Sequence, residues 1–331
     1  IITHDLAVVA EIADKIVVMQ NGQIVETAKT EVLLYNMKHP YTRALFNAST
    51  HRVVMPDVIT SGTLLSVDSV VRTYSLPRNG VLGSRPNFNA LDNVSFNISH
   101  GERVGLVGES GCGKSTLTRA ILGVEDVQSG WIKLDGEPVF SGKRPNIDVR
   151  RKMQVVFQDP YSSFNPRHRV DRLIAEPLHV LENAPVGKLK DLAILKALED
   201  VGLMASDAKK FIHEFSGGQR QRIAIARALI IEPELIIFDE AVSALDVSVR
   251  AQVLDLIAEL CHKRPLAYLF ISHDLSVVRT VTDRVMIMRA GKIVEHGETE
   301  KVFTNPQNAY TKTLIAAAPR LPEITYAIEP V

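Results

Sequence analysis

A glycine-rich stretch of eight residues has the residue types and the spacing to hold a polyphosphate. Its sequence is Gly108-Glu109-Ser110-Gly111-Cys112-Gly113-Lys114-Ser115. Because glycine lets the backbone fold tightly, successive N–H groups can point inward and meet phosphate oxygens. Lys114 then supplies a mobile charge for the β- and γ-phosphates, and the hydroxyl of Ser115 is placed to bind Mg²⁺. The stretch therefore predicts a triphosphate-binding loop.

The flanking residues place this loop between a strand and a helix. Residues 104–107 form an apolar run typical of a buried strand, and residues 116–122 have helical spacing. A helix that begins near Lys114 directs the positive end of its dipole toward the loop. A glycine turn that binds nothing is the alternative, which these flanks make rare. A dinucleotide site is not indicated, because no G-x-G-x-x-G sequence opens the helix.

Two adjacent carboxylates stand at the end of another apolar run. Asp239 and Glu240 follow residues 235–238, a run typical of a parallel strand that is covered on both faces. Ligands of open α/β sheets bind at the carboxyl ends of the strands, and buried neighbouring carboxylates need a partner such as a magnesium nucleotide. His273 follows the next apolar run, residues 266–271, in the same way.

Two further features point to nucleotide. Ser216-Gly217-Gly218-Gln219 precedes a predicted helix over residues 220–230, and such a turn at a helix start is a second anion-binding site. Tyr74 ends a predicted strand over residues 63–74, and its ring could stack on a purine, although a tyrosine at a strand end more often only packs.

Composition limits the possible partners and environment. The 331 residues are enough for about two domains. The 38 basic and 38 acidic residues balance, so no overall charge favours nucleic acid or an anionic membrane. Cys112 and Cys261 are the only cysteines, which fits a reducing cytosol. The apolar runs are too short to cross a bilayer, so we expect any membrane association to be peripheral.

Residues 1–48 repeat residues 270–317 without a gap. His4-Asp5-Leu6 matches His273-Asp274-Leu275, and Tyr41-Thr42 matches Tyr310-Thr311. So long a self-match indicates one structural piece that occurs twice. We expect residues 1–48 to be the C-terminal remnant of a first domain whose phosphate loop is absent from this sequence. Residues 49–62 are then a linker, 63–318 a complete domain and 319–331 a tail.

Three predicted strands lead into the phosphate loop. They lie over residues 63–74, 93–98 and 103–107, and a loop rich in Gly, Pro and Asn over residues 77–89 follows the first. The three strands suggest an antiparallel edge attached to the nucleotide core. Beyond the phosphate loop, the helical periodicity of residues 170–212 predicts a separate helical lobe.

Taken in order, these motifs resemble the ATP-binding subunits of ABC transporters. They are the loop 108–115, Gln158 after a strand, Ser216–Gln219, Asp239-Glu240, Ser243–Asp246 and His273. The sequences around Gln158-Asp159-Pro160 and Glu240–Asp246, with the Tyr310-Thr311 tail, resemble the oligopeptide, dipeptide and nickel import branch. The partial repeat at the start looks like the tandem members of that branch, which carry two nucleotide-binding domains in one chain.

The resemblance implies an α/β fold, in which a P-loop NTPase core with a parallel sheet carries an antiparallel β subdomain and a helical subdomain. ATP would lie between the loop of one domain and the Ser216–Gln219 signature of another, and His4 would belong to that second site. Glu240 would orient or deprotonate the attacking water, His273 would contact the γ-phosphate, and Lys114 would hold the phosphates. The residues implied for nucleotide binding are Tyr74, Gly108, Glu109, Ser110, Gly111, Cys112, Gly113, Lys114, Ser115, Thr116, Gln158, Ser216, Gly217, Gly218 and Gln219, and those for Mg²⁺ are Ser115, Gln158 and Asp239.

The function implied is that of an ATP-hydrolysing importer subunit, which couples ATP to the uptake of peptides or similar small solutes. It would act on the cytoplasmic face of the bacterial inner membrane with separate membrane permeases, a second nucleotide-binding domain and, indirectly, an extracytoplasmic solute-binding protein. No Cys follows Cys261, so no iron–sulfur cluster is expected, and no nucleic acid partner is expected. Two alternatives remain: a ribosome- or DNA-associated ABC ATPase, which would favour a basic surface, and a chain that binds nucleotide but is inactive alone.

Overall fold

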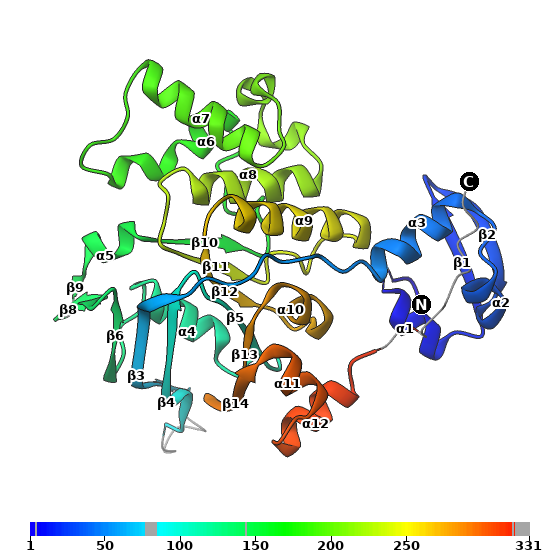
Figure 1. Ribbon diagram of the computed structural model, residues 1–331, viewed down its shortest axis with the longest axis horizontal. Helices are drawn as coiled ribbons and strands as arrows, with labels where there is room; N and C mark the ends of the chain where they lie inside the picture. Colours follow the sequence, from blue (N-terminus) through cyan, green and yellow to red (C-terminus); the bar gives the residue numbers. More distant parts are fainter. Residues whose placement is uncertain (4, 77–84, 143, 320, 322–331) are drawn as a thin grey trace.

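The computed structural model describes all residues except 4, 77–84, 143, 320 and 322–331 (Figure 1). Its centre is a six-stranded sheet in the order β10-β11-β12-β5-β13-β14, in which β14 alone is antiparallel to its neighbour. The strands of this sheet are β5 (Arg103–Val107), β10 (Met153–Phe157), β11 (Leu235–Asp239), β12 (Ala267–Ile271), β13 (Arg284–Arg289) and β14 (Lys292–Glu298). The predicted parallel core is confirmed.

Both faces of this sheet are covered, as the apolar runs predict. Ile236 and Phe238 of β11 point into one core cluster, with α8 (Gly217–Leu229), α9 (Val247–Lys263) and α10 (Leu275–Val281). Leu235 and Ile237 point into a second cluster on the opposite face, with α4 (Lys114–Ile121). Because side chains alternate along a strand, a continuous apolar sequence fills both cores at once.

An antiparallel sheet packs on the α4 side of the core. It has the order β4-β3-β6-β7, with β3 (Ser61–Ser75), β4 (Asn87–His100), β6 (Ser129–Leu134) and β7 (Glu137–Pro138). The expectation that residues 103–107 also belong to an antiparallel edge was wrong, because β5 pairs in parallel with β12 and β13. Part of the loop expected after Tyr74 lies outside the described residues. The next elements are β8 (Phe140–Ser141), β9 (Arg144–Pro145) and α5 (Ile147–Arg151).

The helical lobe predicted over residues 170–212 is present and packs on α8 (Figure 1). Its elements are α6 (Val170–Ile174), the 3-10 helix η1 (Glu176–Val180), α7 (Lys188–Asp200), and the 3-10 helices η2 (Ala205–Lys209) and η3 (Ile212–Glu214). Among the described helices of the whole chain, none combines the length and apolar character needed to cross a bilayer.

The two copies of the sequence repeat fold alike. The first copy comprises α1 (Leu6–Ile12), β1 (Lys15–Gln20), β2 (Gln23–Lys29), α2 (Thr30–Tyr35) and α3 (Pro40–Ser49), and the second comprises α10, β13, β14, α11 (Thr299–Thr304) and α12 (Ala309–Ala316). A break in register occurs at matching points, between Val18 and Met19 in one hairpin and between Ile287 and Met288 in the other. The copies differ in their neighbours, because β13 joins the central sheet whereas β1 pairs with β2 in a separate two-stranded sheet.

The first copy lies beside one end of α9, at the right of Figure 1. Residues 51–60 carry no helix or strand and connect it to β3. This segment is held against the core, because a guanidinium nitrogen of Arg103 donates to the carbonyl of Pro56 at 2.7 Å. His51 Nε2 also lies 2.7 Å from a carboxylate oxygen of Asp255 on α9.

Candidate functional site

The glycine-rich loop connects β5 to α4 and has the backbone that its sequence predicts. Gly111 and Gly113 have φ angles of +82° and +116°, in the left-handed region that favours glycine. A Cβ atom on Gly113 would lie 2.3 Å from the carbonyl oxygen of Ala90, and one on Gly108 would lie 2.2 Å from that of Met288. Gly108 and Gly113 therefore leave no room for a side chain, and only glycine fits at either position.

Lys114 lies inside the loop. Its Nζ donates hydrogen bonds to the carbonyls of Gly108 at 2.7 Å and Glu109 at 3.0 Å, and the residue is 6% exposed. The lysine thus closes the loop on itself and keeps its charge at the centre. Tyr310, from α12 of the second repeat copy, accepts a hydrogen bond from the N–H of Glu109 at 3.3 Å. Sequence reasoning singled out Tyr310 only as part of a tail motif and gave no signal that it reaches the loop.

A cleft of about 320 Å³ lies beside Ser115, the first residue after the lysine, and brings four of the predicted site residues together. Its lining comes from the start of α4 and from the carboxyl ends of β10 and β11; the residues are Ser115, Phe157, Gln158, Asp159, Ser162, Asp239 and Glu240. The structure therefore assembles Ser115, Gln158 and Asp239, the three oxygen donors expected for Mg²⁺. Phe157, Asp159 and Ser162 were not expected as site residues.

The donor set fits Mg²⁺ better than a metal that needs an all-protein site. It offers one hydroxyl, one amide and one carboxylate, and Mg²⁺ commonly combines one or two carboxylates with water and substrate phosphates. In the part of the chain that the structure describes, no group of three or more His, Cys, Asp or Glu side chains is arranged to bind a metal. Burial raises the pKa of Asp239, and the neighbouring Glu240 charge adds to this, whereas Lys114 and Arg119 oppose it.

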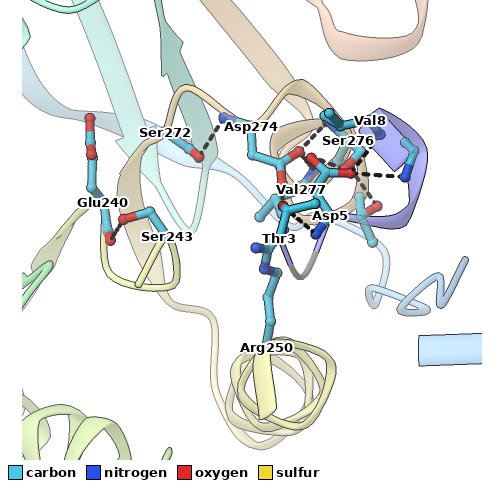
Figure 2. Close-up of polar contacts among 12 residues, drawn as sticks. Thr3, Asp5, Val8, Glu240, Ser243, Arg250, Ser272, Asp274, Ser276 and Val277 are labelled. Carbon is cyan, nitrogen blue, oxygen red and sulfur yellow. Dashed lines mark hydrogen bonds and ion pairs between the residues drawn. The ribbon is translucent and has the colours of Figure 1, made fainter. Parts of the chain in front are cut away.

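Glu240 and His273 approach each other at the rim of the cleft. His273 Nδ1 lies 3.4 Å from a carboxylate oxygen of Glu240, and the side chains are 57% and 23% exposed, respectively. Glu240 has a φ angle of +52°, unusual for a residue with a side chain. Three hydrogen bonds hold its backbone. Its N–H donates to the carbonyl of Ile271 at 2.9 Å, and its carbonyl accepts from the N–H of Ser243 at 3.1 Å. The Ser243 hydroxyl donates to the same carbonyl at 2.8 Å (Figure 2). These bonds therefore fix the backbone position from which the Glu240 side chain extends.

The Ser216–Gln219 signature forms a helix start away from this cleft. Ser216 Oγ accepts from the N–H of Gln219 at 3.4 Å, and the N–H of Ser216 donates to the side-chain oxygen of Gln219 at 3.0 Å. None of the four signature residues lines the cleft. Ser216, Gly217 and Gln219 are exposed, so this anion-binding helix start faces outward.

Tyr74 also lies outside the cleft lining. Its hydroxyl donates to the Glu125 carboxylate at 2.6 Å, and the Arg72 guanidinium lies 5.0 Å from the ring centre. The ring is therefore held in place at the end of β3, half-buried. Expected site residue His4 lies outside the described residues.

Comparison with known proteins identifies two families along the chain. The family model "ABC transporter" matches residues 91–243, which include the glycine-rich loop and the two acids. A second model, "Oligopeptide/dipeptide transporter, C-terminal region", matches residues 25–54 and again residues 294–329. The second model thus finds both copies of the repeat.

Curated relatives and solved structures agree with this result. The glutathione import ATP-binding protein GsiA of Escherichia coli K12 is 42% identical over 345 residues, which cover 96% of this chain and 55% of the relative. YejF of the same strain, an uncharacterized ABC transporter ATP-binding protein, is 43% identical and is 60% covered. The chain thus spans little more than half the length of these relatives.

Two solved structures share the fold. CbiO1 of Clostridium perfringens, part of an ABC transporter complex, is 26% identical with a TM-score of 0.63 over 74% of this chain and 92% of its own. The ATP-binding cassette MJ0796, solved as a dimer in a post-hydrolysis state with ADP and Pi, is 26% identical with a TM-score of 0.62 over 71% and 99%.

Proposed function

Because this chain belongs to the ABC transporter family, in the oligopeptide and dipeptide import branch, we propose that it is an ATP-hydrolysing subunit of an importer. One observation carries the proposal: a single cleft is lined by Ser115, Gln158, Asp239 and Glu240, directly after the loop that Lys114 closes. Phosphoryl transfer mainly requires positioning and charge stabilisation, and these residues supply both.

We propose the following role for each residue. The loop N–H groups and Lys114 hold the phosphates, in place of the two carbonyls that the lysine now contacts. Ser115, Gln158 and Asp239 hold Mg²⁺, which neutralises phosphate charge when it is bound. Glu240 orients or deprotonates the attacking water, since its partly exposed carboxylate faces the cleft. His273 contacts the γ-phosphate from the rim, and Tyr74 stacks on the adenine.

The outward-facing signature supports a partner in hydrolysis. Ser216–Gln219 would close over the nucleotide of a second nucleotide-binding domain, because it lines no part of its own cleft. Residues 63–318 are the complete domain of this chain, and residues 1–48 are the C-terminal part of another, since they repeat residues 270–317 element for element. Residues 49–62 are the linker between them and 319–331 the tail.

We assign the remaining partners by family. This chain would bind membrane permease subunits on the cytoplasmic face of the inner membrane and couple ATP hydrolysis to transport through them. An extracytoplasmic solute-binding protein would act indirectly. The relative named for glutathione import supports a small peptide-like solute.

The test replaces the proposed base. Glu240→Gln keeps the size and hydrogen bonding of the side chain but removes its charge, so ATP binding should stay within about threefold while turnover falls about 100-fold or more. Binding is measured by titration with Mg-ATP and turnover by phosphate release. Glu199→Gln, an exposed change on α7, is the control. Undiminished hydrolysis by Glu240→Gln would refute the assignment.

A further inference from the structure

The carboxylate of Asp274 binds residues of two helices, α10 and α9. Helix α10 begins just after His273, and α9 begins just after the segment that carries Glu240. Asp274 follows His273 and caps α10, because its Oδ1 accepts bonds from the N–H groups of Ser276 at 3.0 Å and Val277 at 3.3 Å. Its Oδ2 accepts a bond from the guanidinium of Arg250 at 2.6 Å. Figure 2 shows Arg250 extending from α9 toward this carboxylate. Asp274 therefore caps one helix and is bound to the other.

Arg250 is tied in turn to the segment that carries Glu240. It lies in the first turn of α9, where its N–H donates to the carbonyl of Asp246 at 2.8 Å. Asp246 caps this helix by accepting from the N–H of Val249 at 2.9 Å. Residues 240–246 form the short connection from Glu240 to that cap, and Ser243 within it holds the Glu240 carbonyl. The ion pair between Arg250 and Asp274 thus joins the Glu240 segment to the His273 segment.

His273 has little else to hold it. Its 3.4 Å contact with Glu240 is long for a hydrogen bond, and more than half of its side chain is exposed. The Arg250 and Asp274 side chains are only 19% and 27% exposed, so water screens their attraction less than it screens a surface pair. The better shielded pair therefore sets where the backbone at His273 lies.

The first repeat copy shows that an aspartate can cap this helix without an ion pair to an arginine. Asp5, the counterpart of Asp274, caps α1 through the N–H groups of Ala7 at 2.9 Å and Val8 at 3.2 Å. Within the described ranges, no basic side chain pairs with Asp5. The same cap forms without an arginine. The Nε of Arg250 is buried with no hydrogen-bond partner among the described residues, so the bond to Asp274 comes from the outer guanidinium nitrogen.

We propose that Arg250 is a positioning residue for ATP turnover, which acts through Asp274 to hold His273 beside Glu240. The inference rests on the proposed function. Arg250 lines no part of the cleft, so its loss slows the chemical step and leaves nucleotide binding intact.

A double-mutant cycle tests this route. Arg250→Gln should lower the single-turnover rate about tenfold, with the Kd for Mg-ATP changed less than about threefold, and Arg250→Lys should recover part of the rate. In a His273→Ala background, adding Arg250→Gln should change the residual rate less than about twofold, because the residue it positions is gone. A merely structural role would slow both backgrounds equally.

The control is Arg279→Gln on α10, the helix that Asp274 caps. This change breaks an exposed ion pair with Glu300 of α11 and should leave the rate unchanged. An unchanged rate in Arg250→Gln, a parallel loss of affinity, or an equal loss in the His273→Ala background would overturn the inference. Any of these three results would leave the proposed function intact, provided that wild type hydrolyses ATP and Glu240→Gln does not. Absence of wild-type turnover would overturn both.

Discussion

At the scale of single residues, Asp239 is an ionisable group that the fold places at a cost in free energy. Burial raises its pKa, and the adjacent Glu240 carboxylate raises it further. The folded chain therefore binds a proton at Asp239 at pH values where the unfolded chain has released it. Its contribution to stability falls as the pH rises from the unfolded pKa through the folded pKa, and stays reduced above it. A bound Mg²⁺ would offset that cost.

Asp239→Asn removes the buried charge while keeping the shape of the side chain. We expect this variant to melt at a higher temperature than wild type at pH 7 without nucleotide, and the gain to shrink as the pH falls and Asp239 becomes protonated. Adding Mg-ATP should stabilise wild type more than the variant, because one Mg²⁺ ligand is weakened. Thermal unfolding at several pH values measures these shifts. A gain that does not change with pH, or a loss at pH 7, would contradict this account of Asp239.

Much of the proposed site could be predicted from sequence at this scale. Lys114 and Ser115 are fixed by a local motif, and Asp239 follows an apolar run that ends at the ligand-binding edge of the sheet. The contacts of Lys114 with carbonyls of its own loop could not be predicted, because they depend on the folded shape of the loop. The hydrogen bond between Tyr310 and Glu109 could not be predicted either, because it joins residues 201 positions apart in the sequence. The roles of the site residues remain predictions.

At the scale of elements, the signature helix α8 is positioned by a glycine. A Cβ atom on Gly218 would lie 2.2 Å from a methyl carbon of Val249 on α9, so the two helices approach closely only because that atom is absent. The neighbouring Gly217 is different, since a Cβ there would meet only Leu245, at 4.0 Å. The second glycine of the signature therefore allows the close packing of α8 on α9.

The two glycines give a matched pair of variants. Gly218→Ala should destabilise the chain by about 1–3 kcal/mol, because overpacking forces α8 away from α9. Gly217→Ala should change stability by less than about 1 kcal/mol, because alanine favours a helix and the space is open. Urea unfolding without nucleotide measures both. Equal effects of the two substitutions would show that contact with Val249 does not limit the approach of the helices.

Element prediction failed where pairing overrode local sequence. Residues 87–89 contain two asparagines and were expected to end a loop, yet β4 begins at Asn87 because Phe88 pairs with Tyr74 of β3. Residues 103–107 were correctly predicted as a strand, but their neighbours were not, since partners in a sheet depend on distant strands. The buried runs of β11 and β12 were predictable, because an all-apolar sequence fits a strand covered on both faces.

At the scale of the whole molecule, the two repeat copies show how context determines burial. Met286 and Met288 of β13 are fully buried, whereas their counterparts Val17 and Met19 of β1 are 48% and 57% exposed. β13 lies between β14 and β5 in the central sheet, and β1 pairs with β2 in its own sheet. The sequence match predicted that the two copies share a fold. It could not predict that the first copy would lie beside α9, because that contact depends on residues such as His51 and Asp255 outside the repeat.

The central claim is that a magnesium-bound triphosphate binds at the loop closed by Lys114, facing Asp239 and Glu240. Calorimetric titration with ATP, with and without Mg²⁺, tests it most directly in wild type, Lys114→Ala and the exposed control Lys196→Ala. We expect saturable binding by wild type and the control, and at least about tenfold weaker binding by Lys114→Ala, since a charge-assisted hydrogen bond contributes about 1.5–3 kcal/mol. Folded wild type that binds no Mg-ATP, or Lys114→Ala that binds it as tightly as wild type, would contradict the claim.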